Sequence, residues 1–191
     1  NAVWRYTPGP MEGWSLLIGR DHFDEAPPEY GTIGVADTDN MPGARSDHHS
    51  FIGPAGDLWV IGGSGMQTDI DNGYLGDVWR LELGMAPAWV EVAPSGQAPL
   101  QRWGHTAVYW PDFGDAIVFG GYIDEPPYYF GDCWRLHLGD DPSWSLIPTH
   151  DGRRYHHAAV YDPVGERMLS VGGVRPADGK ANDVWQLTLG E

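Results

Sequence analysis

The chain has 191 residues, and 27 acidic against 11 basic side chains give it a formal net charge of −16 at pH 7. Because it contains no basic run, nucleic-acid phosphates and anionic membrane surfaces are poor partners, whereas cationic partners and metal ions suit the charge. No apolar run approaches the roughly 20 residues of a membrane-spanning helix, so we expect no membrane insertion.

The chain opens with residues 1–18, which we interpret as the last two strands of a four-stranded unit. Val3–Tyr6 and Trp14–Ile18 are the strand candidates. Residues 19–44 follow as an acidic insertion rich in Pro and Gly, and this insertion contains Glu25. A connection this long in a compact array is usually functional or mobile.

Three longer units follow, over residues 45–93, 102–148 and 153–191. Each contains a small and β-branched run, an apolar run that ends in Gly-Gly, and an alternating strand that begins with Asp-x-Trp. In the first two units a second tryptophan opens an outer strand, which the unit 153–191 lacks. Four strands in about 50 residues predict a propeller blade.

The same markers return in the same order in all three units. The Arg-x-x-His openings are Arg45–His48, Arg102–His105 and Arg154–His157, the glycine pairs begin at Gly62, Gly120 and Gly172, and the Asp-x-Trp strands begin at Asp77, Asp132 and Asp183. This combination resembles the Kelch-repeat β-propeller family over essentially the whole chain, apart from the insertion. The resemblance implies an all-β fold of four-stranded antiparallel blades, a complete Kelch-type propeller or a fragment of one. It says little about function, since the family includes enzymes, ubiquitin-ligase adaptors, cytoskeletal cross-linkers and secreted modules.

The two ends leave two arrangements open. In one, Trp14–Ile18 supplies the outer strand that the unit 153–191 lacks and closes a small ring. In the other, these residues belong to a longer chain or to a multi-chain assembly. We favour the second, because propellers have about 4–8 blades and stacked repeats need neighbours to bury their faces.

Candidate contact residues lie in the loops that differ between the units. The loop 121–131 carries Tyr128, Tyr129 and Phe130, whose aromatic rings suit protein or sugar partners if they do not pack over their own blade. The loop 64–74 carries Asp69 and Asp71 in a run that resembles the opening of a calcium loop. Arg80 stands where an EF-hand needs an acidic residue, so an EF-hand is excluded and an acidic turn is the simpler interpretation.

Catalytic signatures are thin: the sequence has no Gly-x-Ser-x-Gly elbow, no His-Glu-x-x-His and no phosphate-binding loop, although its 27 carboxylates leave a pair of acids for glycoside hydrolysis open. The Arg-x-x-His openings recur in every unit, so we interpret them as structural, bonded to neighbouring backbone or to each other. Cys133 occupies the position of Val78 and Val184, which indicates a small buried hydrophobe. The cysteine–tyrosine chemistry of Kelch-like copper-radical oxidases is therefore not carried over. We predict no catalytic residue, no metal site and no cofactor, with a calcium ion in an acidic loop as the alternative.

The sequence favours a non-catalytic scaffold that binds a protein or a glycan. Its predicted contact residues are Tyr128, Tyr129, Phe130, Asp69, Asp71 and Glu25. Ten tryptophans and an acidic, lysine-poor composition suggest an extracellular or cell-surface setting. The alternatives are a secreted carbohydrate-active or oxidase-type enzyme with its site at the ring centre, and an intracellular adaptor. Acidic and histidine side chains that converge on one cleft would favour the enzyme.

Overall fold

The computed structural model describes residues 2–10, 12–19, 28–68, 71–149, 152–176 and 179–189, and every regular element within these ranges is a strand. The described residues therefore contain no helix that is long and apolar enough to cross a membrane. The strands are β1 (Ala2–Thr7), β2 (Gly13–Gly19), β3 (Arg45–Ser46), β4 (His49–Ile52), β5 (Leu58–Thr68), β6 (Asp71–Glu82), β7 (Ala88–Val92), β8 (Ser95–Gly96), β9 (Thr106–Trp110), β10 (Asp115–Phe119), β11 (Cys133–His137), β12 (Ser143–Ile147), β13 (Ala158–Asp162), β14 (Arg167–Val171), β15 (Val174–Arg175), β16 (Gly179–Lys180) and β17 (Val184–Leu187).

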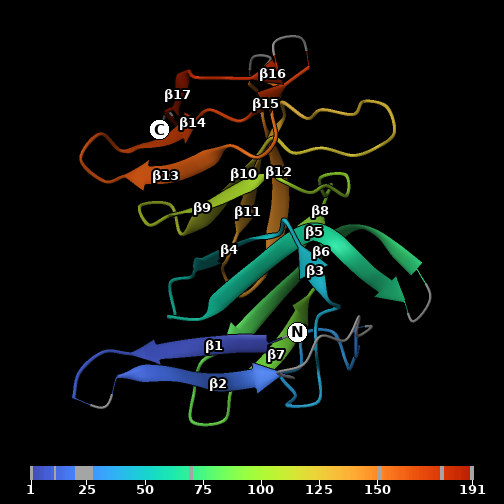
Figure 1. Cartoon of the computed structure of the whole chain (residues 1–191), viewed down its shortest axis with the longest axis vertical. Coiled ribbons are helices and arrows are strands. Elements are labelled where there is room, and N and C mark those ends of the chain that lie inside the picture. The colour runs from blue at the N-terminus through green and yellow to red at the C-terminus, as the bar shows by residue number, and fades with distance from the viewer. Residues whose placement is uncertain are drawn as a thin grey trace.

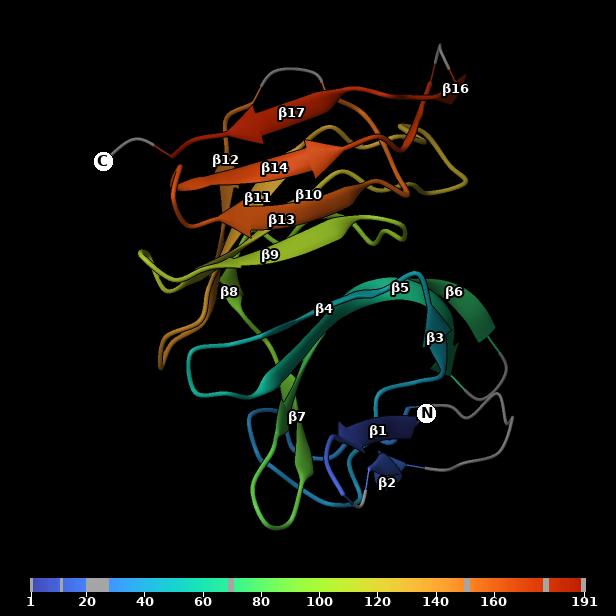
Figure 2. The ribbon, with the colours of Figure 1, turned by 60° about the vertical axis from the view of Figure 1, so that its left-hand side comes forward.

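Three antiparallel sheets form the body of the molecule. The first sheet runs β4-β5-β6-β7, the second β9-β10-β11-β12 and the third β13-β14-β17. Figures 1 and 2 show the sheets following one another along the molecule, with the N-terminal hairpin β1–β2 at the end away from the third sheet. The apolar runs that precede the glycine pairs form the second strand of each sheet, as the repeat predicts.

The two faces of the second sheet pack against different neighbours, because successive side chains of a strand point to opposite faces. Ala107, Val118 and Trp134 join a core with residues of the first sheet. Val108 and Cys133, on the other face, join a core with the third sheet. Cys133 therefore occupies a buried apolar position between two sheets.

Backbone hydrogen bonds join each repeat to the next at the second x of Arg-x-x-His. The Gly104 amide donates to the Asp47 carbonyl at 3.0 Å, and the His156 amide donates to the Gly104 carbonyl at 2.7 Å. All three residues have positive φ, at 51°, 62° and 52°. The histidine of the second and third Arg-x-x-His segments packs against the glycine pair of the preceding repeat. For example, a Cβ on Gly120 would lie 2.9 Å from the ring of His157. Glycine is therefore required where the repeats meet.

Segments between the sheets cover two of their outer edges. Part of the insertion lies along β7, where the Gly34 amide donates to Glu91 O at 2.9 Å and the Asp37 amide to Trp89 O at 3.2 Å. The buried Asn40 side chain donates to the same Trp89 carbonyl at 3.0 Å. On the second sheet, β8 pairs in parallel with the start of β12. Only the stretches that are covered in this way are closed to a foreign strand, and on β12 these are Ser143 and Trp144.

One expectation differs from the structure, and the structure also does not follow the less favoured of the two arrangements of the chain ends. Residues 64–74 were expected as a loop, but β5 and β6 continue through most of it, with Ser64 opposite Tyr74 and a register shift beside Gly63. Trp14–Ile18 does not complete the third sheet: β2 pairs with β1, and Val3, Leu17 and Ile18 pack on the first sheet. The third sheet consequently exposes apolar side chains whose counterparts in the second sheet are covered, with Val184 64% exposed and Cys133 1%.

Candidate functional site

The recurring arginines form a structural unit that is repeated in each sheet. Arg102, only 3% exposed, donates to both carboxylate oxygens of Asp132 at 2.5 and 2.9 Å and to the carbonyls of Leu100 and Gly120 at 2.9 and 3.0 Å. The Trp134 indole donates to the same carboxylate at 2.7 Å. Arg45 with Asp77 and Trp79, and Arg154 with Asp183 and Trp185, repeat the arrangement.

The carboxylate partner of these arginines was not predicted. Its signal was present in the sequence, because an aspartate recurs at the start of every Asp-x-Trp strand. Burial raises the pKa of Asp132, but the hydrogen bonds from Arg102 and Trp134 outweigh it and hold that pKa below its usual value. The unit is therefore an ion pair that stabilises each blade.

Two of the recurring histidines, His105 and His157, are buried side chains. Burial, followed by the nearby Arg154 guanidinium, lowers the pKa of His157 to about 3, and His157 Nε2 lies 2.8 Å from Thr106 Oγ1. Burial also holds the pKa of His105 well below its usual value. Both rings are neutral near pH 7. Within the described residues, no group of three or more His, Cys, Asp or Glu side chains is placed to hold a metal ion.

An aromatic cluster lies at one end of the sheets, on the side where the Arg-x-x-His segments begin. It consists of Trp103, Tyr122, Tyr129, Tyr155 and His156. Trp103 lies 5.5 Å from Tyr122, 5.4 Å from Tyr155 and 5.0 Å from His156 between ring centroids, and Tyr129 lies 5.1 Å from Tyr122. The four larger rings are half-buried and His156 is exposed. The cluster thus joins the second sheet's loops to the opening of the third.

The same side of the molecule carries the tip of β5–β6, the loop 121–131 and the hairpin β15–β16, and we call it the loop face. In Figure 1 the tip of β5–β6 and the gold 121–131 loop project to the right, away from the short turns on the left. Carboxylates accompany the cluster: Asp124 accepts a hydrogen bond from the Tyr74 hydroxyl, and Asp47 lies 3.1 Å from His156 Nε2. The bond to Asp124 raises the pKa of Tyr74 to about 12, so this phenol stays neutral.

The predicted contact residues fall in different environments. Tyr128 is 45% exposed with φ of 59°, and Tyr129 belongs to the aromatic cluster. Phe130 is 5% exposed, with the Arg102 guanidinium 4.0 Å above its ring, so it supports the loop from below and offers little contact surface. Asp71 begins β6 opposite Thr68. Glu25 and Asp69 lie outside the described residues.

The remaining members of the cluster, Trp103, Tyr122, Tyr155 and His156, were not predicted. Trp103 and Tyr155 both stand directly after the arginine of Arg-x-x-His, and Tyr122 follows a glycine pair. These positions differ between the repeats, and the aromatic residues at them could have indicated a contact surface.

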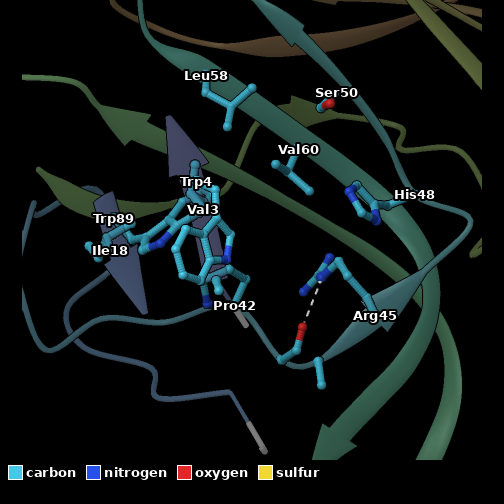
Figure 3. Close-up of a pocket in the computed structure, with 13 residues that line it drawn as sticks. Val3, Trp4, Ile18, Pro42, Arg45, His48, Ser50, Leu58, Val60 and Trp89 are labelled. Carbon is cyan, nitrogen blue, oxygen red and sulfur yellow. Dashed lines mark hydrogen bonds between the residues drawn. The ribbon is translucent and has the colours of Figure 1, made fainter. Parts of the chain in front are cut away.

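A pocket of about 470 Å³ separates the N-terminal hairpin from the first sheet (Figure 3). Val3, Trp4 and Ile18 line one side, and Leu58 and Val60 the other. Arg45, at one end of the pocket, donates to the Gly43 and Gly62 carbonyls and to Asp77. Burial lowers the pKa of the adjacent His48, so that ring is neutral near pH 7.

The repeated strand order, the arginine–aspartate pairs and the glycine pairs against histidine together define a β-propeller module. The family model described as the KLHDC2/KLHL20/DRC7 Kelch-repeats domain matches residues 34–191. The chain therefore belongs to the Kelch-repeat family.

The chain is also similar to individual proteins. The chain is 31% identical over 116 residues to multiple epidermal growth factor-like domains protein 8 of Rattus norvegicus, and 29% identical over 126 residues to the Mus musculus protein of that name. These matches cover 54% and 60% of this chain but 4% of each relative. The solved structure of YjhT superposes with a TM-score of 0.71 at 18% identity, covering 98% of this chain and 56% of that one. At this identity the likeness concerns the fold alone.

Proposed function

We propose that this chain is a protein-binding module that meets its partner with the loop face. The observation that carries the proposal is the aromatic cluster with the exposed Tyr128 beside it. Aromatic rings supply large contact areas, and rings already held by one another lose little conformational freedom when a partner binds. Membership of the Kelch-repeat family, whose domains generally bind proteins, supports the same function.

The charge of the loop face favours a basic partner. Asp47, Asp124 and Glu125 lie on this face, which also carries Arg175 and Lys180 in the hairpin β15–β16, and the whole chain carries a formal charge of −16. Complementary charge steers association and discriminates against acidic proteins. The contact residues in this proposal are Tyr128 and Tyr129 with these carboxylates; Glu25, Asp69 and Asp71 remain predictions.

The proposed setting is extracellular or cell-surface. The relatives from rat and mouse are named for epidermal growth factor-like domains, a class of small, disulfide-dense secreted domain. The exposed apolar face of the third sheet supports a further proposal, that another blade, from the same chain or from a second one, packs there.

Binding of a fluorescent tetramer of the chain to a panel of cell lines tests the proposal. We expect binding that brief protease treatment of the cells removes, that enzymatic deglycosylation spares, and that weakens as salt is raised. Tyr128→Ala and Glu125→Lys should lower it, whereas Val164→Asp, at a 94% exposed position on the opposite turn, should not. Loss on deglycosylation alone would assign the face to a glycan, and binding unaffected by either loop-face substitution would refute the proposal.

A further inference from the structure

The second sheet carries a groove at its outer edge. This edge groove has a volume of about 540 Å³, and its lining includes Leu100, Tyr129, Phe130, Leu146 and Arg153. Leu100 is 62% exposed and Leu146 56% exposed. The groove is thus lined by two large exposed apolar side chains, one of them on β12, the last antiparallel strand of the sheet.

The first sheet has the equivalent hollow, and there the chain itself fills part of it. Leu75, Gly76, Asp77 and Gln101 line that hollow, and their repeat counterparts line the edge groove: Phe130, Gly131, Asp132 and Arg153. In the first sheet the insertion adds Tyr30 to the lining, stacked on Trp79 with 5.7 Å between ring centroids. The partly filled hollow measures about 380 Å³.

The insertion also uses the backbone of the outer strand. The Gly34 amide donates to Glu91 O at 2.9 Å, and residues 34–37 run antiparallel to β7. Leu146 is the counterpart of Glu91 in the second sheet. There β8 pairs only with Ser143 and Trp144 and ends before Leu146. The insertion covers β7 from Trp89 to Glu91. In β12 the counterpart of Trp89 is Trp144, which β8 already covers, and Leu146 is the counterpart that β8 leaves open.

We propose that the edge groove is a binding site for an extended segment of a protein partner. The segment adds to β12 at Leu146 through its backbone, as the insertion adds to β7 at Glu91. It places one aromatic or large apolar side chain in the edge groove beside Leu100, as the insertion places Tyr30 in the equivalent hollow of the first sheet. Strand addition of this kind takes its affinity from main-chain hydrogen bonds and its specificity from a side-chain pocket. The edge groove shares Tyr129 with the loop face, but the backbone of β12 and the side chains of Leu100 and Leu146, on which this proposal depends, are not among the loop-face contact residues.

The chain supplies its own probe, a synthetic peptide of residues 28–41. Added to the 191-residue protein labelled at its methyl groups, it should shift the NMR signals of Leu100 and Leu146. A peptide with Tyr30→Ala should bind about tenfold more weakly, as expected for the loss of an aromatic anchor. In the protein, Leu146→Asp and, separately, Leu100→Asp should weaken binding by a similar factor, whereas the matched Val164→Asp should leave it unchanged.

Both substituted leucines are largely exposed, so we expect the variants to fold, and tryptophan fluorescence checks this. Shifts confined to β7 would mean that the peptide only exchanges with the insertion, and would overturn the proposal. Equal affinity of the two peptides, or no shift at Leu100 and Leu146 up to the limit of peptide solubility, would overturn it as well. None of these outcomes depends on Tyr128, so failure here leaves the loop-face proposal standing.

Discussion

Removing the Arg102 guanidinium should destabilise the fold far more than removing an exposed arginine. Arg102→Ala deletes the paired bonds to Asp132 and leaves the carbonyls of Leu100 and Gly120 without this donor. Breaking a fully buried ion pair costs about 3–5 kcal/mol. Because the Asp132 side chain is 29% exposed and water can reach it, we expect the lower end, about 3 kcal/mol.

Two companion variants separate charge from geometry. Arg102→Lys keeps a cation but loses the planar fork that engages both carboxylate oxygens, so we expect a loss of about 1–2 kcal/mol. Arg167→Ala is the matched control: Arg167 pairs with Asp162 at 2.9 Å, but the two side chains are 38% and 22% exposed. An exposed pair contributes about 0–1 kcal/mol.

Urea unfolding followed by tryptophan fluorescence measures these differences, provided that the variants share one m-value. A double-mutant cycle with Asp132→Ala then isolates the pair, and it should return a coupling energy of about 1–3 kcal/mol. If Arg102→Ala costs no more than Arg167→Ala, the repeated ion pair does not hold the blades and our interpretation is wrong.

Three further predictions follow from burial. Buried His157 stays neutral in the fold but takes up a proton in the unfolded chain, so it should lower the free energy of unfolding by about 1.4 kcal/mol per pH unit as the pH falls from about 6.5 toward 3. Urea unfolding at several pH values should give a shallower dependence of this free energy on pH for His157→Gln. An unchanged dependence would contradict the prediction. Burial, and next the Asp132 carboxylate, raises the pKa of Cys133 to about 12, so a thiol reagent should label it only after unfolding; labelling at the rate of a free thiol in native buffer would place Cys133 at the surface. Phe130→Ala should destabilise the fold by about 3 kcal/mol, as expected for a buried aromatic side chain, whereas Tyr128→Ala should change stability little; the reverse result in urea unfolding would exchange their roles.

The blade itself was predictable from the sequence, because its signals are local. Gly-Gly ends a buried strand and Asp-x-Trp opens the next one, so the strands around Ile117 and Trp134 could be located from single stretches. The extension of β5–β6 was not, since its tip pairs Gly65 with Gly73 and lacks the apolar alternation that identifies a half-buried strand.

The candidate surfaces depend on contacts between distant segments. Trp103, Tyr122 and Tyr155 come from three separate stretches, and nothing in any one of them indicates that the rings meet. The docking of the insertion on β7 likewise depends on the Asn40 side chain reaching a carbonyl 49 residues away. Such contacts follow from the assembled fold, and sequence periodicity does not report them.

The chain of bonds from Asp47 through Gly104 to His156 has a consequence for how such a protein diversifies. Beside the side-chain cores, successive blades are joined here by peptide groups, whose donors and acceptors are the same for almost every residue type. Their immediate neighbours are free to differ, and they do: Ser46, Trp103 and Tyr155 occupy equivalent positions. Single substitutions at these neighbouring positions can therefore change the recognition surface, while the backbone hydrogen bonds between successive blades are kept.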